Sequence, residues 1–200
     1  MERNPEVQWR LAAVMYHAAH NIENVEERRA KILEALELAK ASLACNAESA
    51  EAAKYAAILA GTAAEFEGAS SLEQMKRGAE FKKLLDTAIA LSKEPDMSLL
   101  HARGRFSYKV ASLAAPVRLV ACGIFGTLPT CTYQEALDDL LASEEISPSF
   151  DTLHFIGLCY VALGNKDKAR EYFTRVIEDE SAGPTDIEWQ GESRKALDQL

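Results

Sequence analysis

The chain has 200 residues, a formal net charge of −9 and a hydrophobic content of 48%. That length suffices for one domain with a sizeable core or for one short helical solenoid. Ten glycines and six prolines are too few for a β-sandwich with many tight turns. The acidic balance argues against nucleic acid or an anionic membrane as the default partner, because like charges repel.

The cysteines and the start of the chain bear on its compartment. Cys45, Cys122, Cys131 and Cys159 form no CxxC pair, so we expect buried free thiols in a reducing compartment. The first residues lead directly into a predicted helix, which predicts no signal peptide. No stretch approaches the ~18–20 apolar residues that span a bilayer, so we expect no transmembrane segment.

Four helices are predicted in the first half of the chain, at residues 5–20, 25–45, 49–66 and 72–93. Asn4 caps the first helix and Pro5 opens it. The apolar stripe predicted for this helix consists of Val7, Leu11, Val14 and Ala18. The third helix carries a small-residue face that allows close packing, namely Ala53, Ala56, Ala57 and Ala60. A turn is expected at residues 68–71.

Six more helices are predicted in the second half, at 97–114, 117–125, 133–146, 150–163, 166–180 and 185–199. The short apolar helix 117–125 is expected to end at Gly126, and a loop is expected at 128–132. Thr132 and Glu135 have the spacing of a capping box at the start of helix 133–146. The last helix is polar on its outer side, which is typical of a helix that caps a stack.

The stretch from Phe150 to Gly183 has the spacing of a tetratricopeptide repeat. Gly157 and Ala169 are small where two antiparallel helices would cross closely. Gly164 suits a left-handed C-cap after the first helix of the pair. A repeat of this kind favours a binding scaffold over an enzyme.

The predicted fold is therefore all-α, a tetratricopeptide-like superhelix of about four antiparallel helix pairs plus a C-terminal capping helix. The pairs are about 5–45, 49–93, 97–146 and 150–180, and the capping helix is about 185–199. An insertion at about 115–131 separates the two helices of the third pair. No linker or shift in composition divides the chain, so we expect a single domain over 1–200.

Several segments resemble the regulator of microtubule dynamics family, whose members have tetratricopeptide-like domains. The specific part is 104–170, which includes the run Gly104-Arg105-Phe106-Ser107-Tyr108 and the run Thr132-Tyr133-Gln134-Glu135-Ala136-Leu137. Lys54-Tyr55-Ala56 and Phe81-Lys82-Lys83 are similar to the family too.

The resemblance implies association with microtubules and the mitotic spindle, in the cytoplasm or at spindle poles. It also implies that some relatives are anchored to mitochondria or endoplasmic reticulum and take part in organelle contacts and lipid binding. In contrast to those relatives, we expect no N-terminal hydrophobic anchor in this sequence. The family supplies no catalytic motif.

A basic island occupies the most family-like segment. Residues 97–134 contain no Asp or Glu but hold His101, Arg103, Arg105, Lys109 and Arg118, whereas 135–151 holds six acids and no base. Arg105 and Lys109 are i,i+4 on one helix face, beside Tyr108. One interpretation is a site for an acidic partner such as tubulin tails or a lipid phosphate. The alternative is that these cations pair with helix 133–146 and cap helix ends.

Repeat geometry predicts that the first helix of each pair lines a concave binding face. With the basic island, the predicted partner-binding residues are Trp9, Tyr16, Lys54, His101, Arg105, Tyr108, Lys109, Arg118 and His154. An aromatic and cationic groove of this kind suits a peptide or an amphiphile. The alternative is that the last helix or packed side chains fill the groove.

No motif for catalysis or metal binding is present. His17 and His20 lack further ligands, so C-terminal placement on a helix is the better interpretation. The adjacent acids at 138–139 and 144–145 point apart on a helix and predict a solvated face. We therefore expect no enzyme, no catalytic residues, no metal and no cofactor.

The sequence leads to a non-enzymatic interaction domain that associates with microtubules, tubulin or spindle-associated proteins in the cytoplasm and cytoskeleton. The alternatives are a phospholipid-binding or transfer module at organelle contacts, and a general protein–protein adaptor or scaffold that binds an acidic peptide.

Overall fold

The computed structural model describes residues 4–66, 70–125, 130–183 and 186–200. Within these ranges the chain is helical and contains no strand, which confirms the all-α prediction. It forms two compact units, Met1–Pro95 and Asp96–Leu200, which we call unit 1 and unit 2. The single domain expected over 1–200 stays a prediction. The turn at 68–71, the end at Gly126 and the loop at 128–132 lie wholly or partly outside the described residues.

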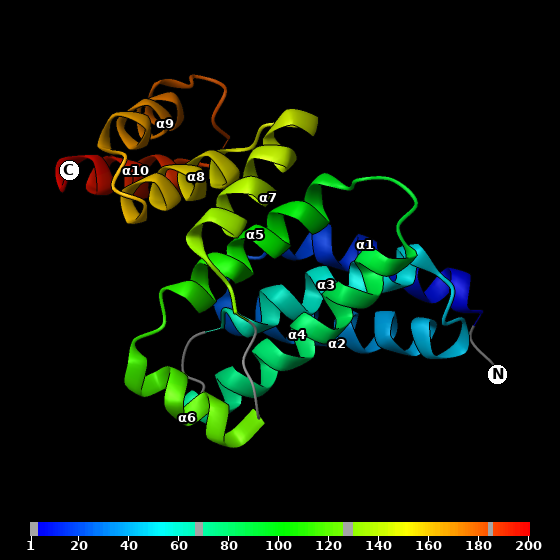
Figure 1. Ribbon diagram of the computed structural model, residues 1–200. Coiled ribbons are helices and arrows are strands. Elements are labelled where there is room, and N and C mark those ends of the chain that lie inside the picture. Colours follow the sequence, from blue (N-terminus) through cyan, green and yellow to red (C-terminus); the bar gives the residue numbers. More distant parts are fainter. Residues whose placement is uncertain (1–3, 67–69, 126–129, 184–185) are drawn as a thin grey trace. The chain divides into compact units, whose positions relative to one another are not determined.

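Unit 1 consists of four helices, α1 (Pro5–Ala19), α2 (Val25–Cys45), α3 (Ala50–Ala64) and α4 (Ser71–Leu91). Consecutive helices pack against each other, and α1 also contacts α3 (Figure 1). The Asn4 side chain accepts a hydrogen bond from the Glu6 amide, and Pro5 follows it, as predicted. Short connections hold neighbouring helices together as antiparallel hairpins.

The centre of unit 1 is the alanine face of α3. Its fully buried members include the predicted set of Ala53, Ala56, Ala57 and Ala60, each at most 2% exposed. Because alanine side chains are small, α3 can approach three other helices closely. On α4, Phe81 lies so near the backbone of α3 that a Cβ on Gly61 would be 3.0 Å from its ring.

The prediction that the apolar stripe of α1 is its buried face was wrong. Val7, Leu11 and Val14 are 59%, 46% and 64% exposed. The buried stripe is the neighbouring one, which contains Gln8, Ala12, Met15 and Ala19. This stripe faces inward because α2 and α3 both pack on α1.

Unit 2 consists of six helices: α5 (Met97–Ala111), α6 (Ala115–Phe125), α7 (Tyr133–Ile146), α8 (Phe150–Ala162), α9 (Lys166–Glu178) and α10 (Ile187–Asp198). Helix α5 packs on α7 rather than on α6, as the predicted insertion requires. Helices α8 and α9 form the next pair, and α10 packs on both of them. The capping box of Thr132 and Glu135 is present at the start of α7.

The glycines of the predicted repeat have the expected roles. A Cβ on Gly157 would be 2.5 Å from the ring of Phe173, so the α8–α9 crossing requires glycine. Gly164 has φ +78°, and the Asn165 amide donates to the Tyr160 carbonyl oxygen at 2.9 Å. With the bond from the Gly164 amide to the Val161 carbonyl oxygen, this is a Schellman motif.

The same hydrogen bond recurs in both units. The Ser42 hydroxyl of α2 donates to the carbonyl oxygen of Pro5, the first residue of α1, at 2.8 Å. The Ser143 hydroxyl of α7 donates to the carbonyl oxygen of Met97, the first residue of α5, at 2.9 Å. Both serines are fully buried. Pairs α1–α2 and α5–α7 therefore share one contact at the same end, as repeated units do.

The four cysteines differ in environment. Only Cys159 is buried, and burial raises the pKa of its thiol to about 12. Cys45 is exposed, and Cys122 and Cys131 are half-buried, so the prediction of buried thiols was wrong for these three. Among the described residues, no helix combines the length and the apolar character that crossing a bilayer requires.

Candidate functional site

The basic island begins on α5, whose N-terminus is capped by Asp96 and whose middle crosses α7. The Asp96 side chain accepts hydrogen bonds from the amides of Ser98 and Leu99. A Cβ on Gly104 would be 2.6 Å from Leu140 Cγ, so α5 and α7 are in close contact at this point. This crossing fixes the directions in which the neighbouring basic residues point.

Two cations of the island have partners inside unit 2. Arg103 Nε and Nη2 donate to the two carboxylate oxygens of Asp139 on α7, at 2.7 and 2.6 Å. Arg118 on α6 donates from Nη2 to the Val110 carbonyl oxygen at 2.7 Å, in the last turn of α5. Pairing with helix 133–146 and capping of a helix end, the alternative weighed from the sequence, accounts for these two residues.

Arg105 lies against an aromatic surface. Its guanidinium carbon is 4.7 Å from the ring centroid of Phe155 on α8 and 5.8 Å from that of Trp189 on α10. A guanidinium over aromatic rings is attracted by their negative faces. Three helices of unit 2 therefore meet at this side chain.

Tyr108 and Lys109 continue this face toward the end of α5. The Tyr108 ring is 5.7 Å from Phe155 and 5.6 Å from Tyr133, and burial raises the pKa of its phenol. Lys109 is exposed in the last turn of α5. A cation at the C-terminus of a helix is favoured by the helix dipole.

His101, at the other end of α5, belongs to a polar network with the start of α8. Its Nδ1 is 2.7 Å from Thr152 Oγ1, and its Nε2 is 3.1 Å from Asp151 Oδ2. Burial alone would raise the pKa of Asp151, but the His101 ring, the Ser149 hydroxyl and the Arg105 charge hold it well below its usual range. The carboxylate is therefore a fixed negative charge that joins α5 to α8.

His154 lies in the interior. It is 6% exposed, its Nδ1 is 2.8 Å from Ser193 Oγ, and its ring is 5.5 Å from Trp189. Burial lowers the pKa of this histidine to about 4, so it is neutral at pH 7. Helix α10 covers it, which accords with the alternative that the last helix fills the predicted groove at this position.

Trp189 and Ser193 of α10 are the residues of this cluster that the sequence analysis missed. They are i,i+4 and lie on the face of α10 that packs on α8. The sequence signal that could have predicted this contact is a tryptophan and a serine on one face of an otherwise polar final helix. They show that α10 contributes side chains to the cluster as well as capping the stack.

The three predicted site residues of unit 1 lie on α1 and α3. Trp9 on α1 stacks on Tyr55 of α3, with centroids 6.0 Å apart and planes at 14°, and the Arg10 guanidinium carbon lies over the Trp9 ring at 4.6 Å from its centroid. Tyr16 packs against the rings of His17 and His20. Lys54 is half-buried on α3.

The adjacent acids of α7 are not simply a solvated face, which corrects the sequence-based expectation. Asp139 is paired with Arg103, and Glu144 pairs with Arg175 at 2.6 Å and accepts a hydrogen bond from the Tyr172 hydroxyl at 3.1 Å. Their side chains are only 16% and 15% exposed. These carboxylates hold α7 to α5 and to α9. Within the described ranges, no group of three or more His, Cys, Asp or Glu side chains is arranged to hold a metal ion.

Known proteins resemble this chain along its whole length. The family model for regulator of microtubule dynamics protein 1-3 matches residues 1–200. Regulator of microtubule dynamics protein 1 of Caenorhabditis elegans is 27% identical over 197 residues, which is 98% of this chain and 85% of that protein. Regulator of microtubule dynamics protein 2 of Bos taurus is 37% identical over 119 residues, or 58% of this chain and 28% of that protein.

Regulator of microtubule dynamics protein 3 of Rattus norvegicus is 31% identical over 188 residues, or 90% of this chain and 39% of that protein. The alignments thus span less than half the length of the bovine and rat relatives, and most of the nematode one.

Proposed function

Because the chain belongs to the regulator of microtubule dynamics protein 1-3 family, we propose that it is a non-enzymatic interaction domain that associates with microtubules or with spindle-associated proteins. The observation that carries this proposal is the family match over residues 1–200. The cytoplasm and the microtubule cytoskeleton, including the spindle and its poles, are the corresponding locations. No cofactor or catalytic step enters the proposal.

The proposed contact surface is the end of α5, with Arg105, Tyr108 and Lys109. Lys109 is exposed and lies one turn after Arg105, and both belong to an acid-free segment. A local cation-rich surface attracts acidic chains such as tubulin tails even when the net charge is negative, because the field near a surface follows the nearest charges.

Co-sedimentation of the full chain with stabilised microtubules across a salt series tests this proposal. We expect pelleting at low salt that decreases as salt rises, and weaker pelleting of Lys109→Glu. Lys76→Glu is the matched control, because Lys76 is an exposed lysine on α4 and the change in net charge is the same. Equal loss in both variants would indicate a general charge effect, and no pelleting at low salt would contradict direct binding.

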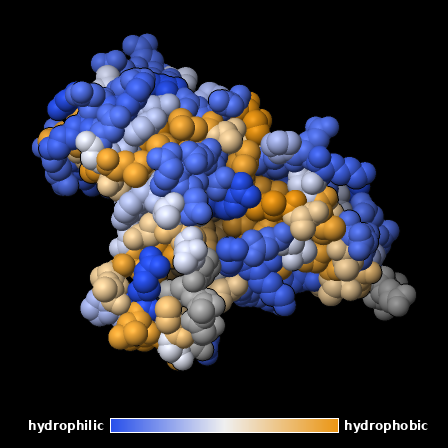
Figure 2. All heavy atoms as spheres, viewed as in Figure 1, coloured by the Kyte–Doolittle hydropathy of each residue, from blue (hydrophilic) through white to orange (hydrophobic). Residues whose placement is uncertain are grey.

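A second candidate, binding to a phospholipid surface, is favoured by α6. Val117, Leu119 and Val120 are 41%, 75% and 55% exposed, and apolar side chains occupy much of the visible surface of this helix (Figure 2). A short apolar helix in an acid-free segment suits the interface of a membrane. Flotation with vesicles of phosphatidylcholine and phosphatidylserine tests it, and we expect a Leu119→Asp/Val120→Asp variant to lose flotation. Flotation that is absent, or unchanged in the variant, would remove this candidate.

A further inference from the structure

An exposed apolar stripe on α1 is left over once the core of unit 1 is packed. Val7, Leu11 and Val14 follow helical spacing and are 59%, 46% and 64% exposed. Apolar side chains are visible at the surface over the N-terminal helices in Figure 2. Single exposed apolar residues are ordinary, but a continuous stripe beside a groove is typical of a docking surface.

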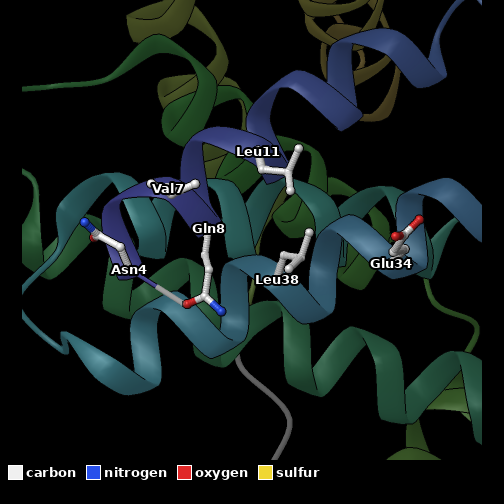
Figure 3. Close-up of a pocket in the computed structure, with 6 residues that line it drawn as sticks. All are labelled: Asn4, Val7, Gln8, Leu11, Glu34 and Leu38. Carbon is white, nitrogen blue, oxygen red and sulfur yellow. The ribbon is translucent and has the colours of Figure 1, made fainter. Parts of the chain in front are cut away.

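The groove lies between α1 and α2 and has a volume of about 430 Å³. The residues that line it are Asn4, Val7, Gln8, Leu11, Glu34 and Leu38. Figure 3 shows Val7 and Leu11 on α1 above Leu38 on α2, with Gln8 between the two helices. Most of the lining is apolar, so the groove favours apolar side chains of a ligand.

Gln8 brings an unused acceptor to this groove. The side chain is 9% exposed, and its Oε1 has no hydrogen-bond partner among the described residues. Nearly all buried polar atoms of folded proteins are paired, so an exception calls for an explanation. Because this oxygen is itself buried, a ligand in the groove donates a hydrogen bond to it only when the Gln8 side chain turns toward the groove.

The charge that lines the groove favours a basic ligand over an acidic one. Among the described residues that line it, Glu34 alone is ionisable, and this carboxylate is 61% exposed. Its 3.2 Å ion pair with Lys31 lies within one helix and is open to water, so it is weak and readily exchanged. A ligand with a lysine or arginine at this position is favoured over one with an acid.

We propose that the α1–α2 groove binds an amphipathic helix of a partner protein, with apolar residues at i, i+4 and i+7 and basic residues beside them. Two packed helices offer a groove into which the ridge of a third helix fits, and they offer no strand edge. A second copy of this chain is disfavoured because each copy carries a net charge of −9. The site lies within unit 1 and is independent of the microtubule contact proposed on α5.

Binding of labelled synthetic helical peptides to the full chain tests the proposal by fluorescence anisotropy. The probe has leucines at i, i+4 and i+7 and lysines on its other faces. One control peptide has the same composition in scrambled order, and another has glutamates in place of the lysines. We expect the probe to bind with one site per chain and at least about tenfold more tightly than either control, which corresponds to about 1.4 kcal/mol.

Three variants of the chain locate the site. Leu11→Asp should weaken probe binding about tenfold or more, and Glu34→Lys should reverse the preference between the basic and acidic peptides. Leu72→Asp, which alters a leucine of matching exposure on α4 (45% against 46% for Leu11), should leave binding unchanged. Gln8→Met should weaken binding severalfold. Because this change removes a buried unpaired atom, it should not destabilise the fold, so weaker binding in this variant would not result from unfolding.

Equal binding of basic and scrambled peptides, or equal loss in Leu11→Asp and Leu72→Asp, would overturn the proposal. Sedimentation equilibrium of the chain alone provides a further test. Self-association that Leu11→Asp abolishes would assign the groove to a second copy and would also overturn it.

Discussion

Unit 1 and unit 2 fill the space between their helices with different side chains. In unit 1, α3 presents a face of alanines, and Val7, Leu11 and Val14 of α1 remain exposed. In unit 2, Phe155, Phe173, Trp189 and their neighbours fill the space between helices, and α10 covers what α8 would otherwise expose. Small residues bring helices close but leave apolar surface unused, whereas aromatic residues use that surface and draw cations such as Arg105 inward.

The chain has one tryptophan in each unit, so the two can be followed separately. Trp9 reports on unit 1 and Trp189 on unit 2. Fluorescence of Trp9→Phe and Trp189→Phe backgrounds during urea unfolding therefore gives a free energy of unfolding for each unit, and it would show directly whether they unfold together.

The largest effect is expected at the aromatic core of unit 2. Phe173 is fully buried, so Phe173→Ala should lower the free energy of unfolding by about 3–5 kcal/mol through lost burial and a residual cavity. The measurement is urea unfolding followed by Trp189. Leu163→Ala, at a position that is 42% exposed, is the control and should cost much less. A loss below about 1 kcal/mol for Phe173→Ala would contradict the account of this core.

The next effect is a pH dependence of unit 2. Burial lowers the pKa of His154 from 6.5 in the unfolded chain to about 4 in the fold, so the folded state resists protonation. Its stabilising contribution is complete above pH 6.5 and is lost as the pH falls toward 4, by about 3 kcal/mol at the lower end. Urea unfolding followed by Trp189 between pH 4 and 7 measures this. His154→Gln should flatten the dependence, and an unchanged slope in that variant would place its origin elsewhere.

A smaller loss is expected at the α8–α9 crossing. Gly157→Ala puts a Cβ 2.5 Å from the buried Phe173 ring, which must shift, and should cost about 1–3 kcal/mol. Gly191→Ala on α10 meets no atom within 4 Å and should be neutral or stabilising by up to about 1 kcal/mol. Thermal unfolding of the two variants compares them, and equal midpoints would show that the crossing tolerates a methyl group.

The smallest expected changes in the free energy of unfolding have opposite signs in the two units. Gln8→Met removes an unpaired buried oxygen and should stabilise unit 1 by about 1 kcal/mol. Gln190→Met removes an amide that donates to the carbonyl oxygens of Val176 and Asp179, at 3.2 and 2.9 Å, and should destabilise unit 2. Urea unfolding followed by Trp9 for the first variant and Trp189 for the second gives both signs. Two changes of the same sign would contradict the distinction between the glutamines.

The sequence predicted local structure well because caps, glycines and periodicity act over a few residues. Asn4, the capping box at Thr132 and the left-handed Gly164 all have the predicted geometry. It failed where three helices compete for one face. The stripe of Val7 and Leu11 is the more hydrophobic one, yet the packing of α2 and α3 on α1 buries the neighbouring stripe of Gln8, Ala12, Met15 and Ala19.

The site was predictable in part for the same reason. Helical spacing brought His101, Arg105 and Tyr108 to one face of α5, and the structure has them there, in contact with α8. The inward position of His154 depends on α10, which is more than thirty residues away along the chain. No motif in α10 predicts which helix it packs on. Whether this face binds a ligand stays a prediction.

The alanine face of α3 also bears on how this sequence can change over generations. Each of these alanines lies against another helix, so one added methylene must be accommodated by a neighbour that loses volume or moves. Substitutions in α3 are therefore expected to appear in homologues together with compensating changes in α1, α2 or α4. Pairs of covarying positions should be densest around this helix and sparse along the exposed face of α9.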